Sequence, residues 1–313
     1  MKVKKYNSQD KKIWDEFVNL SKNKHFFFIR DYMEYHSERF DDYSLMVYTD
    51  SDKLIALLPA NIENKKVFSH QGLTFGGLIF KSSIKQKEVC DVVEAIVSFL
   101  KGESVTNFLY KKMPYIYHLL PSDEDLYPLL NAGFKVSRRD VSSSIKISNQ
   151  IKYSKGRKWI VKKANSHNLS YSESNDIREF WDKLSGVLMT GHGAKPVHTC
   201  EEIVSLKEKF PEQIKFYSAS LDGVQIAGAV IFLTDTVAHT QYLYNTDEGR
   251  EVGALDGLID YLVKEKFKNK EYFDFGTSNE NQGKDINSGL VAQKEGFGAR
   301  VVVHDFYEIK LDD

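Results

Sequence analysis

The residues with the clearest potential for chemistry lie between Tyr272 and Arg300. This stretch begins with a short apolar strand, Tyr272 to Phe275, followed by a polar segment with glycines from Gly276 to Lys284. Four consecutive polar side chains follow the strand closely, at Thr277, Ser278, Asn279 and Glu280. Ligands of open α/β sheets bind at the carboxyl ends of strands. We therefore predict that the end of this strand forms one wall of a binding site.

A second candidate follows the predicted strand Ala238 to Tyr244. Residues 245–254 read NTDEGREVGA and open a helix, where free backbone N–H groups and the helix dipole favour an anion. Arg250 adds a positive charge, and Gly253 and Ala254 leave room for a ligand. The alternative is that the glycines serve only the turn and helix packing. If this strand and Tyr272 to Phe275 are parallel neighbours, their ends also bring together further candidates, namely Tyr242, Tyr244, Asn245, Ser278, Asn279 and Glu280.

Two loops are richer in polar groups than a connection requires. Residues 190–199, TGHGAKPVHT, offer a base near neutral pH and two acceptor contacts, at His192, Lys195 and His198. Residues 69–77, SHQGLTFGG, offer hydrogen bonds to a polar acceptor at His70, Gln71 and Gly72. Either loop can instead be a packed turn. The two histidines of the first loop lack metal-ligand spacing, so we expect no metal there.

The only sizeable basic block lies at residues 152–163, KYSKGRKWIVKK, which carry six positive side chains and no acidic one. Such a block, with Arg157 and Lys158 at its centre, can bind the phosphates of a nucleotide-linked acceptor or of a tRNA. A solvated helix face explains the same pattern equally well.

The elements that must position these residues occur twice along the chain. Each copy reads helix, hairpin, strand, amphipathic helix, strand, helix and strand. The hairpin of the second copy turns at Asp222-Gly223, and Gly133-Phe134 and Gly296-Phe297 precede the last strands of the two copies. We predict two α/β domains, residues 1–149 and 150–313, each with helices around a mixed sheet that starts antiparallel and contains a parallel crossover.

This order resembles the GNAT acyltransferase fold, and the tandem copies, the basic opening of the second copy and the FDFG strand resemble the FemAB-type branch of that superfamily. The resemblance covers nearly the whole chain. It implies acyl-CoA as co-substrate, held by the second domain, and an acceptor held by the first. Arg250 and Gly253 match the first half of the pyrophosphate-binding pattern (Q/R)xxGx(G/A), whereas Leu255 replaces its last small residue.

Acyl transfer to an amine requires a base for the amine proton, donors for the oxyanion and an acid for the leaving group. We expect Glu280 as the base and Tyr244 as the acid, with the thioester arm between the two strand ends, as the resemblance implies. Glu280 can instead be an ordinary loop carboxylate and Tyr244 a half-buried strand residue. Asp274 alternates with two phenylalanines, so we expect it on the opposite face, near the mouth of the site or on a solvated surface.

Composition limits the other possibilities. The chain has 313 residues, 42% apolar and 28% charged, which is typical of soluble globular proteins with two cores. A net charge of -1 excludes a surface given wholly to nucleic acid or anionic membrane. Cys90 and Cys200 fit neither a zinc site nor a disulfide framework. The start of the chain lacks the apolar region of a secretion signal, and no apolar run is long enough to span a membrane, so we expect a cytoplasmic protein.

The sequence thus predicts an acyltransferase that moves an acyl group from acyl-CoA to an amine of a small or cell-envelope-related acceptor. One alternative keeps the fold but takes the acyl group from aminoacyl-tRNA, which would contact the basic block. Another is a protein of the same fold that binds a ligand or partner without turnover.

Overall fold

A computed structural model describes residues 1–311, except for the side chain of His192. The chain forms two compact units, each with its own hydrophobic core. Unit 1 comprises Met1–Asp140 and Val303–Asp313, and unit 2 comprises Val141–Val302. The division expected at residues 149 and 150 therefore differs from the observed one, chiefly because the last strand returns to unit 1.

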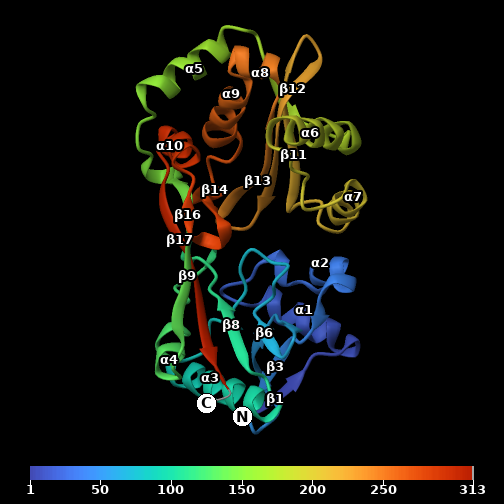
Figure 1. Cartoon of the computed structure of the whole chain (residues 1–313), viewed down its shortest axis with the longest axis vertical. Helices are drawn as coiled ribbons and strands as arrows, with labels where there is room; N and C mark the ends of the chain where they lie inside the picture. The colour runs from blue at the N-terminus through green and yellow to red at the C-terminus, as the bar shows by residue number, and fades with distance from the viewer. Residues whose placement is uncertain (312–313) are drawn as a thin grey trace. The chain divides into compact units, whose positions relative to one another are not determined.

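Unit 1 contains two β-sheets with helices packed against them (Figure 1). One sheet has the strand order β1-β3-β4-β7. The other contains strands in the order β9-β17-β8-β6-β5-β2. The elements of this part of the chain are β1 (Lys2–Lys5), α1 (Lys11–Asn19), α2 (Arg30–Met33), β2 (Asp41–Asp42), β3 (Leu45–Tyr48), β4 (Leu54–Leu58), β5 (Asn61–Glu63), β6 (Lys66–Phe68), β7 (Ile79–Phe80), α3 (Gln86–Gly102), β8 (Asn107–Lys111), α4 (Leu126–Asn131) and β9 (Lys135–Lys146).

Unit 2 is built on one mixed sheet with the order β10-β11-β12-β13-β14-β9. Helix α9 covers one face of this sheet, and α6 and α7 cover the other (Figure 1). Its elements are α5 (Lys155–Asn165), β10 (Ser170–Glu173), α6 (Ile177–His192), α7 (Cys200–Lys209), β11 (Ile214–Leu221), β12 (Val224–Leu233), β13 (Val237–Asn245), α8 (Asp247–Val252), α9 (Ala254–Tyr261), β14 (Tyr272–Thr277), β15 (Asn279–Glu280), β16 (Asp285–Ile286) and α10 (Ser288–Gly296). The last strand, β17 (Arg300–Lys310), begins in unit 2 and lies mostly in unit 1.

The two copies share their element order but not their sheet arrangement. In unit 2 the hairpin β11–β12 continues into β13 within one sheet. In unit 1 the hairpin β3–β4 and strand β6 lie in different sheets. Both copies contain the predicted parallel pair, β6 with β8 and β13 with β14. The predicted mixed sheets are therefore confirmed, and the two units are unequal versions of one plan.

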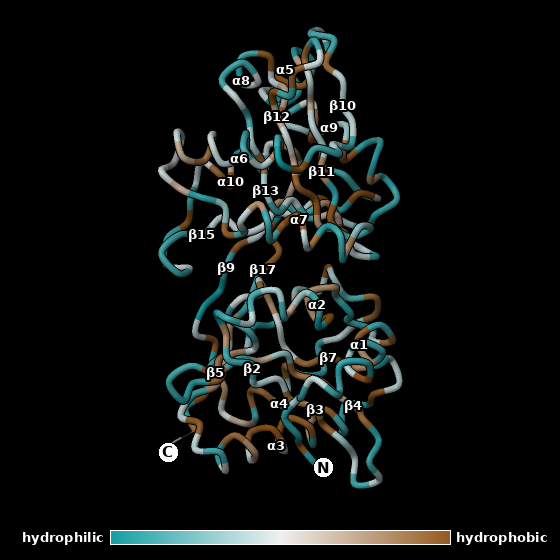
Figure 2. The backbone as a smooth tube through the Cα atoms, turned by 90° about the vertical axis from the view of Figure 1, so that its right-hand side faces the viewer, coloured by the Kyte–Doolittle hydropathy of each residue, from teal (hydrophilic) through white to brown (hydrophobic). Residues whose placement is uncertain are grey.

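Apolar residues at helical and alternating spacing account for both cores. Helix α3 buries Val89, Val92 and Ile96 in unit 1, and α9 buries Leu255, Leu258 and Ile259 in unit 2. Both helices carry hydrophobic stretches in Figure 2. The hairpin β11–β12 turns at Asp222 and Gly223, which both have positive φ, as a two-residue turn requires. In residues 1–311 no helix has the length and hydrophobicity needed to cross a membrane.

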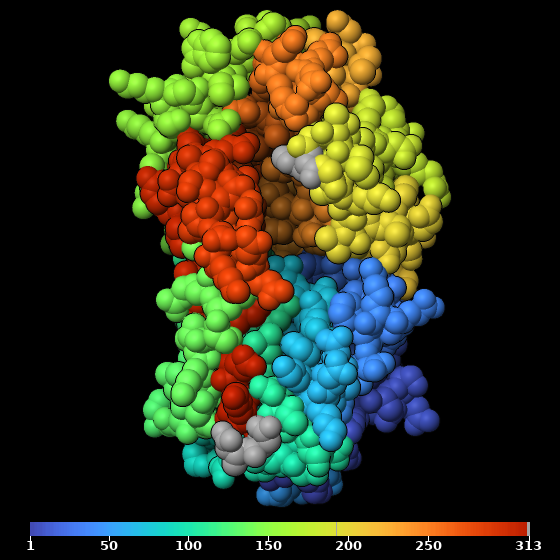
Figure 3. Space-filling model, in the orientation of Figure 1, coloured from blue at the N-terminus to red at the C-terminus, as the bar shows by residue number. Residues whose placement is uncertain are grey.

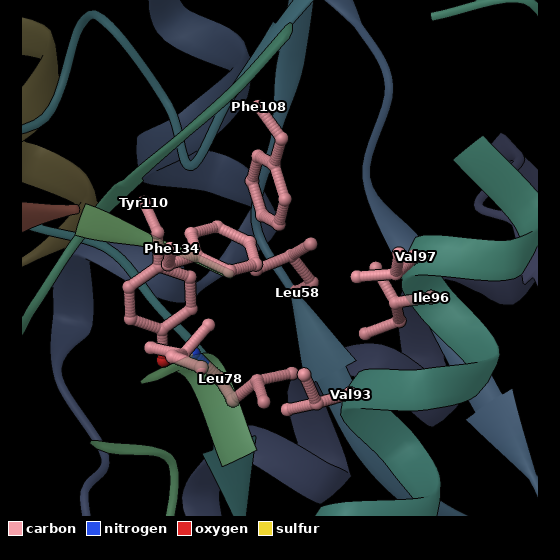
Figure 4. A pocket seen from close by; sticks show the side chains of 9 residues that line it. Leu58, Leu78, Val93, Ile96, Val97, Phe108, Tyr110 and Phe134 are labelled. Atoms are coloured by element: carbon pink, nitrogen blue, oxygen red, sulfur yellow. The ribbon is translucent and has the colours of Figure 1, made fainter. Parts of the chain in front are cut away.

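The core of unit 1 leaves a narrow gap whose lining is almost wholly apolar (Figure 4). Val93, Ile96 and Val97 of α3 face Phe108 and Phe134 across it. The one polar group at its edge is the Tyr110 hydroxyl, which accepts a hydrogen bond from the Leu78 N–H at 2.7 Å and donates one to Asp125. A gap without free polar groups is a packing feature and offers nothing to orient a polar ligand.

Candidate active site

The site is organised by the divergence of β13 and β14. The two strands pair in parallel from Val237 with Tyr272 to His239 with Asp274, as predicted. Beyond this point β13 pairs only with β12 and carries a bulge at Gln241, which lies between residues that oppose Val230 and Ile231. A bulge bends its strand. The last shared register position, His239 with Asp274, therefore lies where the sheet opens.

Asp274 is fully buried and forms the centre of a hydrogen-bond network. Its Oδ1 accepts hydrogen bonds from the hydroxyls of Ser142, at 2.8 Å, and Ser144, both on β9. Its Oδ2 contacts His239 Nδ1 at 2.7 Å and accepts from the Gly276 N–H at 3.3 Å. Several donors directed at one carboxyl stabilise its ionised form. Of the two positions expected for Asp274, the solvated surface was wrong, because the side chain is buried and hydrogen-bonded to serines of the neighbouring strand β9.

His239 is the group through which this network reaches the open side of the strands. An ionised Asp274 accepts a hydrogen bond from His239 Nδ1–H, which leaves Nε2 as the hydrogen-bond acceptor of the neutral ring. The His239 side chain is 13% exposed. Figure 3 shows unit 2 hollowed in front of β13, between the red segment after β14 and the yellow segment of α6 and α7. A histidine oriented by a buried carboxylate at such a place is suited to general base catalysis.

Lys294 of α10 fixes the end of β14 next to this pair. Its ammonium donates hydrogen bonds to Gly276 O at 2.8 Å, Thr277 O at 2.9 Å and Ser278 Oγ at 2.8 Å. Burial lowers the pKa of Lys294 to about 8, although Asp274 opposes the shift. Gly276 has a φ of 75°, and a side chain there would place Cβ 3.1 Å from His239 Cε1. The positive φ favours glycine at this position, and a side chain would also crowd the imidazole.

No sequence profile of a known family matches the chain, and no curated protein matches it in sequence. Among solved structures, FemX superposes with a TM-score of 0.71 at 10% identity, over 99% of this chain and 97% of FemX. The fold is that of FemX. The C-terminal domain of a putative lysylphosphatidylglycerol synthetase from Agrobacterium fabrum superposes with a TM-score of 0.62 at 11% identity, over 97% of this chain and 92% of that one. L-PGS from Bacillus licheniformis superposes with a TM-score of 0.59 at 11% identity, over 87% of this chain and 85% of that one.

The expected FemAB-type arrangement of tandem mixed sheets is confirmed by the FemX fold. Similarity at such low identity concerns the fold alone.

Three predicted residues follow β14, and the structure gives each a local partner. Ser278 Oγ accepts from Lys294, and Asn279 Oδ1 accepts the Val141 N–H at 2.6 Å. Glu280, the predicted base, is exposed and accepts from the Asn287 amide at 2.7 Å. These contacts stabilise the loop between β14 and α10. They match the structural alternative for Glu280, and they leave His239 as the base with the better-defined orientation.

The predicted tyrosines of β13 differ from each other. Tyr244, the expected acid, is buried, and its hydroxyl lies 3.4 Å from Gln225 Oε1. Burial raises the pKa of Tyr244. The Tyr242 hydroxyl lies 2.6 Å from His198 Nδ1, so the structure joins two residues predicted for different ligands. Tyr242 lies opposite Val230 on β12, and His239 lies opposite Phe232. Val230 and Phe232 are two positions apart, so Tyr242 and His239 lie on the same face of the sheet.

The loop that contains His198 holds two further candidates. Lys195 is exposed between α6 and α7. His192 ends α6, and its predicted role as a base concerns a side chain outside the described residues. Among the side chains that the structure describes, no group of three or more His, Cys, Asp or Glu is placed to hold a metal ion.

The predicted anion site before α9 is filled by the protein itself. Gly253 precedes α9 with a φ of 77°, and a Cβ there would lie 2.7 Å from Ile160 Cγ2. Ala254 is buried directly after it. Asp256, in the first turn of α9, forms an ion pair with Arg157 of α5. The helix start is thus covered by α5 and already has a carboxylate near its positive end.

The segment just before this helix start is also explained by packing. Gly249 lies so close to its neighbours that a Cβ would fall 2.3 Å from Asn245 Oδ1 and 2.4 Å from Ile226 O. Arg250 is exposed and paired with Asp247 at 2.7 Å. Packing thus accounts for Gly249, Gly253 and the partial match to the pyrophosphate pattern.

The basic block forms α5 and divides into two faces. Arg157 points inward to Asp256, so it is not available to a phosphate in the way that the sequence indicated. Lys158 is exposed, and Trp159 beside it is 64% exposed. The remaining exposed lysines of this segment are Lys152, Lys155 and Lys162. The result is a positive helix face with one aromatic ring.

The predicted acceptor loop of unit 1 is internally bonded. His70 is buried with a φ of 71°, and burial lowers its pKa to about 3. The Gln71 N–H donates a hydrogen bond to Asn61 Oδ1 at 2.7 Å, and the Asn61 amide donates one to Gln71 Oε1 at 2.5 Å. A Cβ at Gly72 would lie 2.3 Å from His36 Nε2. Lys111 donates to the carbonyls of His70, Gln71 and Leu73. The three predicted residues therefore stabilise a tight loop.

The sequence reasoning missed His239, Lys294 and the two serines of β9. A signal was present for one member of the network, since Asp274 is a charged residue in an otherwise apolar strand. The serines and the histidine that bond to it come from β9 and β13, and only the strand order brings these residues together.

Proposed function

We propose that this chain transfers an acyl group to an amine, with His239 as the general base. The carrying observation is the Asp274–His239 hydrogen bond of 2.7 Å where β13 and β14 diverge. The FemX fold is consistent with this reaction class through the resemblance of the sequence to the FemAB-type branch of the GNAT acyltransferases. Asp274 would hold the imidazole in one tautomer and orientation, with Nε2 toward the substrate.

In this proposal the amine nitrogen attacks the acyl carbonyl carbon while His239 Nε2 removes the amine proton. The bond from the carbonyl carbon to the donor then breaks, and the imidazolium returns the proton to the leaving thiolate or oxygen. The positive charge of the imidazolium would be stabilised by the Asp274 carboxylate, which Ser142 and Ser144 hold in place by hydrogen bonds.

Acyl-CoA remains the first donor to test, and aminoacyl-tRNA is a second candidate favoured by α5. The exposed lysines and the 64% exposed Trp159 combine positive charge with a stacking surface. The start of α9, by contrast, has Asp256 and the cover of Ile160 where a pyrophosphate was expected. Thermal protection by acetyl-CoA or longer acyl-CoAs would favour the first donor. Retention of charged tRNA that weakens with added salt would favour the second.

The experiment that tests the base is acyl transfer to a panel of small amines, amino sugars and envelope-type peptides, followed by mass spectrometry. We expect His239→Gln to lower kcat by about 10²–10⁴-fold, because general base catalysis contributes this much. Asp274→Asn should act in the same direction through the orientation of His239, with substrate KM nearly unchanged.

Two matched variants serve as controls. His167→Gln changes another histidine of unit 2, and Asp222→Asn changes a carboxylate in the β11–β12 turn. Both should retain activity. Full activity in folded His239→Gln protein would refute the assignment of the base. Absence of transfer from every donor by the unaltered chain would refute the acyltransferase function itself.

A further inference from the structure

A surface pocket in unit 1 lies at the start of α3, away from the proposed chemistry. Its volume is about 250 Å³, at the small end for a ligand site. Three lysines line it, Lys53 from the β3–β4 turn and Lys81 and Lys85 from the segment before α3. Ser83 adds a hydroxyl, and Phe17 and Ile84 add an apolar wall. Positive, hydroxyl and apolar groups thus converge on one space.

The charge of this pocket is not compensated by the protein. Other lysines of unit 1 have carboxylate partners, such as Lys5 with Glu103 at 2.5 Å and Lys2 with Asp52 at 2.8 Å. In residues 1–311, Lys53, Lys81 and Lys85 have no carboxylate within ion-pair distance. Lys81 Nζ lies 4.8 Å from the centre of the Phe17 ring, which forms part of the wall. The ammonium groups are therefore available to a ligand.

The one acidic side chain of the pocket is engaged elsewhere. Glu88 accepts a hydrogen bond from the Lys85 backbone N–H at 2.9 Å, as in a capping box. Three positive charges against one carboxylate leave an excess of about two, which complements a dianion. In unit 2, by contrast, the charge at the corresponding start of α9 is compensated by the Asp256–Arg157 ion pair. Of the two helix starts, the one in unit 1 lies beside an open pocket.

We propose that this pocket binds a small ligand with a phosphate or diphosphate group attached to a ring or aliphatic part. The three lysines and the Ser83 hydroxyl would bind the phosphate oxygens by charge-assisted hydrogen bonds. Phe17 and Ile84 would contact the apolar part of the ligand. This site is independent of the proposed acyl transfer, so either can fail alone.

The test is calorimetric titration of the full chain with ADP and, separately, with inorganic phosphate at low salt. We expect binding that weakens as potassium chloride is raised from about 50 to 200 mM, because added salt screens the lysines. The double variant Lys53→Met, Lys81→Met should raise the Kd at least about tenfold, since two of the three charges are lost. Methionine keeps an unbranched side chain of similar length beside Phe17 and removes only the ammonium that lies over the ring.

The control is the double variant Lys87→Met, Lys101→Met, which removes two other lysines of α3 and changes the net charge equally. It should leave the Kd unchanged. Tighter binding of ADP than of inorganic phosphate would support the proposal, because the apolar wall would then contact the nucleoside. Equal binding of both would overturn the part of the proposal that concerns the apolar wall. No binding of either probe at millimolar concentration, or equal weakening by the control, would overturn the proposal as a whole.

Discussion

At the scale of single residues, this molecule places charged groups inside its cores and satisfies them with backbone or hydroxyl partners. Asp274 in unit 2 has four hydrogen-bond partners, and Lys294 caps two carbonyls and a serine. Lys111 in unit 1 caps three carbonyls of the loop after β6. Buried charges are costly unless they are paired in this way, so each identifies a place where the backbone conformation is specified.

Lys111 makes the stability of the chain depend on pH. Burial, with repulsion from Arg138, lowers its pKa from 10.5 to about 7 in the folded chain. Between these values the unfolded chain binds more protons at this site than the folded one, so this residue's contribution to stability rises with pH. Relative to Lys111→Met, the unaltered chain should gain up to about 1.4 kcal/mol in unfolding free energy per pH unit from pH 7.5 to 9.

Urea unfolding at several pH values measures this difference. Lys101→Met, at the exposed end of α3, serves as the matched control and should differ from the unaltered chain by the same amount at each pH. A pH-independent difference for Lys111→Met would show that Lys111 has an ordinary pKa in the folded chain.

At the scale of elements, the packing of α5 on α9 decides what the start of α9 can do. Ile160 covers Gly253, Arg157 pairs with Asp256, and Ala164 and Tyr171 lie against Gly257. A helix start that was predicted to hold a ligand is instead an internal contact. Its glycines should therefore affect stability before they affect binding.

We predict that Gly253→Ala lowers the unfolding free energy by about 1–3 kcal/mol, because it combines a positive φ with a Cβ 2.7 Å from Ile160 Cγ2. Gly186→Ala in α6 is the matched control, since its Cβ would have no neighbour within 4 Å and alanine favours helix there. Thermal unfolding of both variants without ligand is the measurement. An unchanged Tm for Gly253→Ala would show that α5 does not pack closely on this position.

Arg250 distinguishes a donor-binding role of this segment from a purely structural one. It is exposed, and its ion pair with Asp247 is a surface contact. Arg250→Ala should leave the Tm within about 2 °C of the original value, as expected for a surface change. A loss of acyl-CoA protection in this variant would restore the predicted donor site at α8. Unchanged protection would place the donor elsewhere.

At the scale of the whole molecule, the chain crosses from unit 1 to unit 2 along β9 and returns along β17. The last part of β17 pairs with β8, from Phe306 with Lys111 to Lys310 with Asn107. Tyr307, Ile309 and Leu311 belong to the core of unit 1. Unit 1 is therefore complete only when the end of the chain is present.

Removal of residues 303–313 should destabilise unit 1 far more than unit 2. The truncation exposes the edge of β8 and removes three buried side chains from the core. Hydrogen exchange followed by mass spectrometry should show faster exchange in β8 and α3, with β11 and β12 of unit 2 as the internal reference. Equal protection of α3 in both proteins would contradict the discontinuous unit.

Much of the fold was predictable from the order of elements. The hairpin turn at Asp222-Gly223, the amphipathic helices α3 and α9 and the parallel pair β13 and β14 all follow from local spacing and turn chemistry. For the candidate site, the sequence predicted the location at the end of β14 but not the residues that form it. The expected base, Glu280, was the nearest carboxylate in sequence, and the structure gives it a local partner in Asn287.

The sequence by itself determined that the chain contains one plan twice and that the second copy has a polar strand end. These features depend on residues close together along the chain, where periodicity and turn residues act directly. Only the tertiary structure decided that Asp274 meets His239 and two serines of β9, and that α5 covers the start of α9. Such contacts join residues far apart in sequence, and strand order and helix packing bring them together without leaving a local pattern.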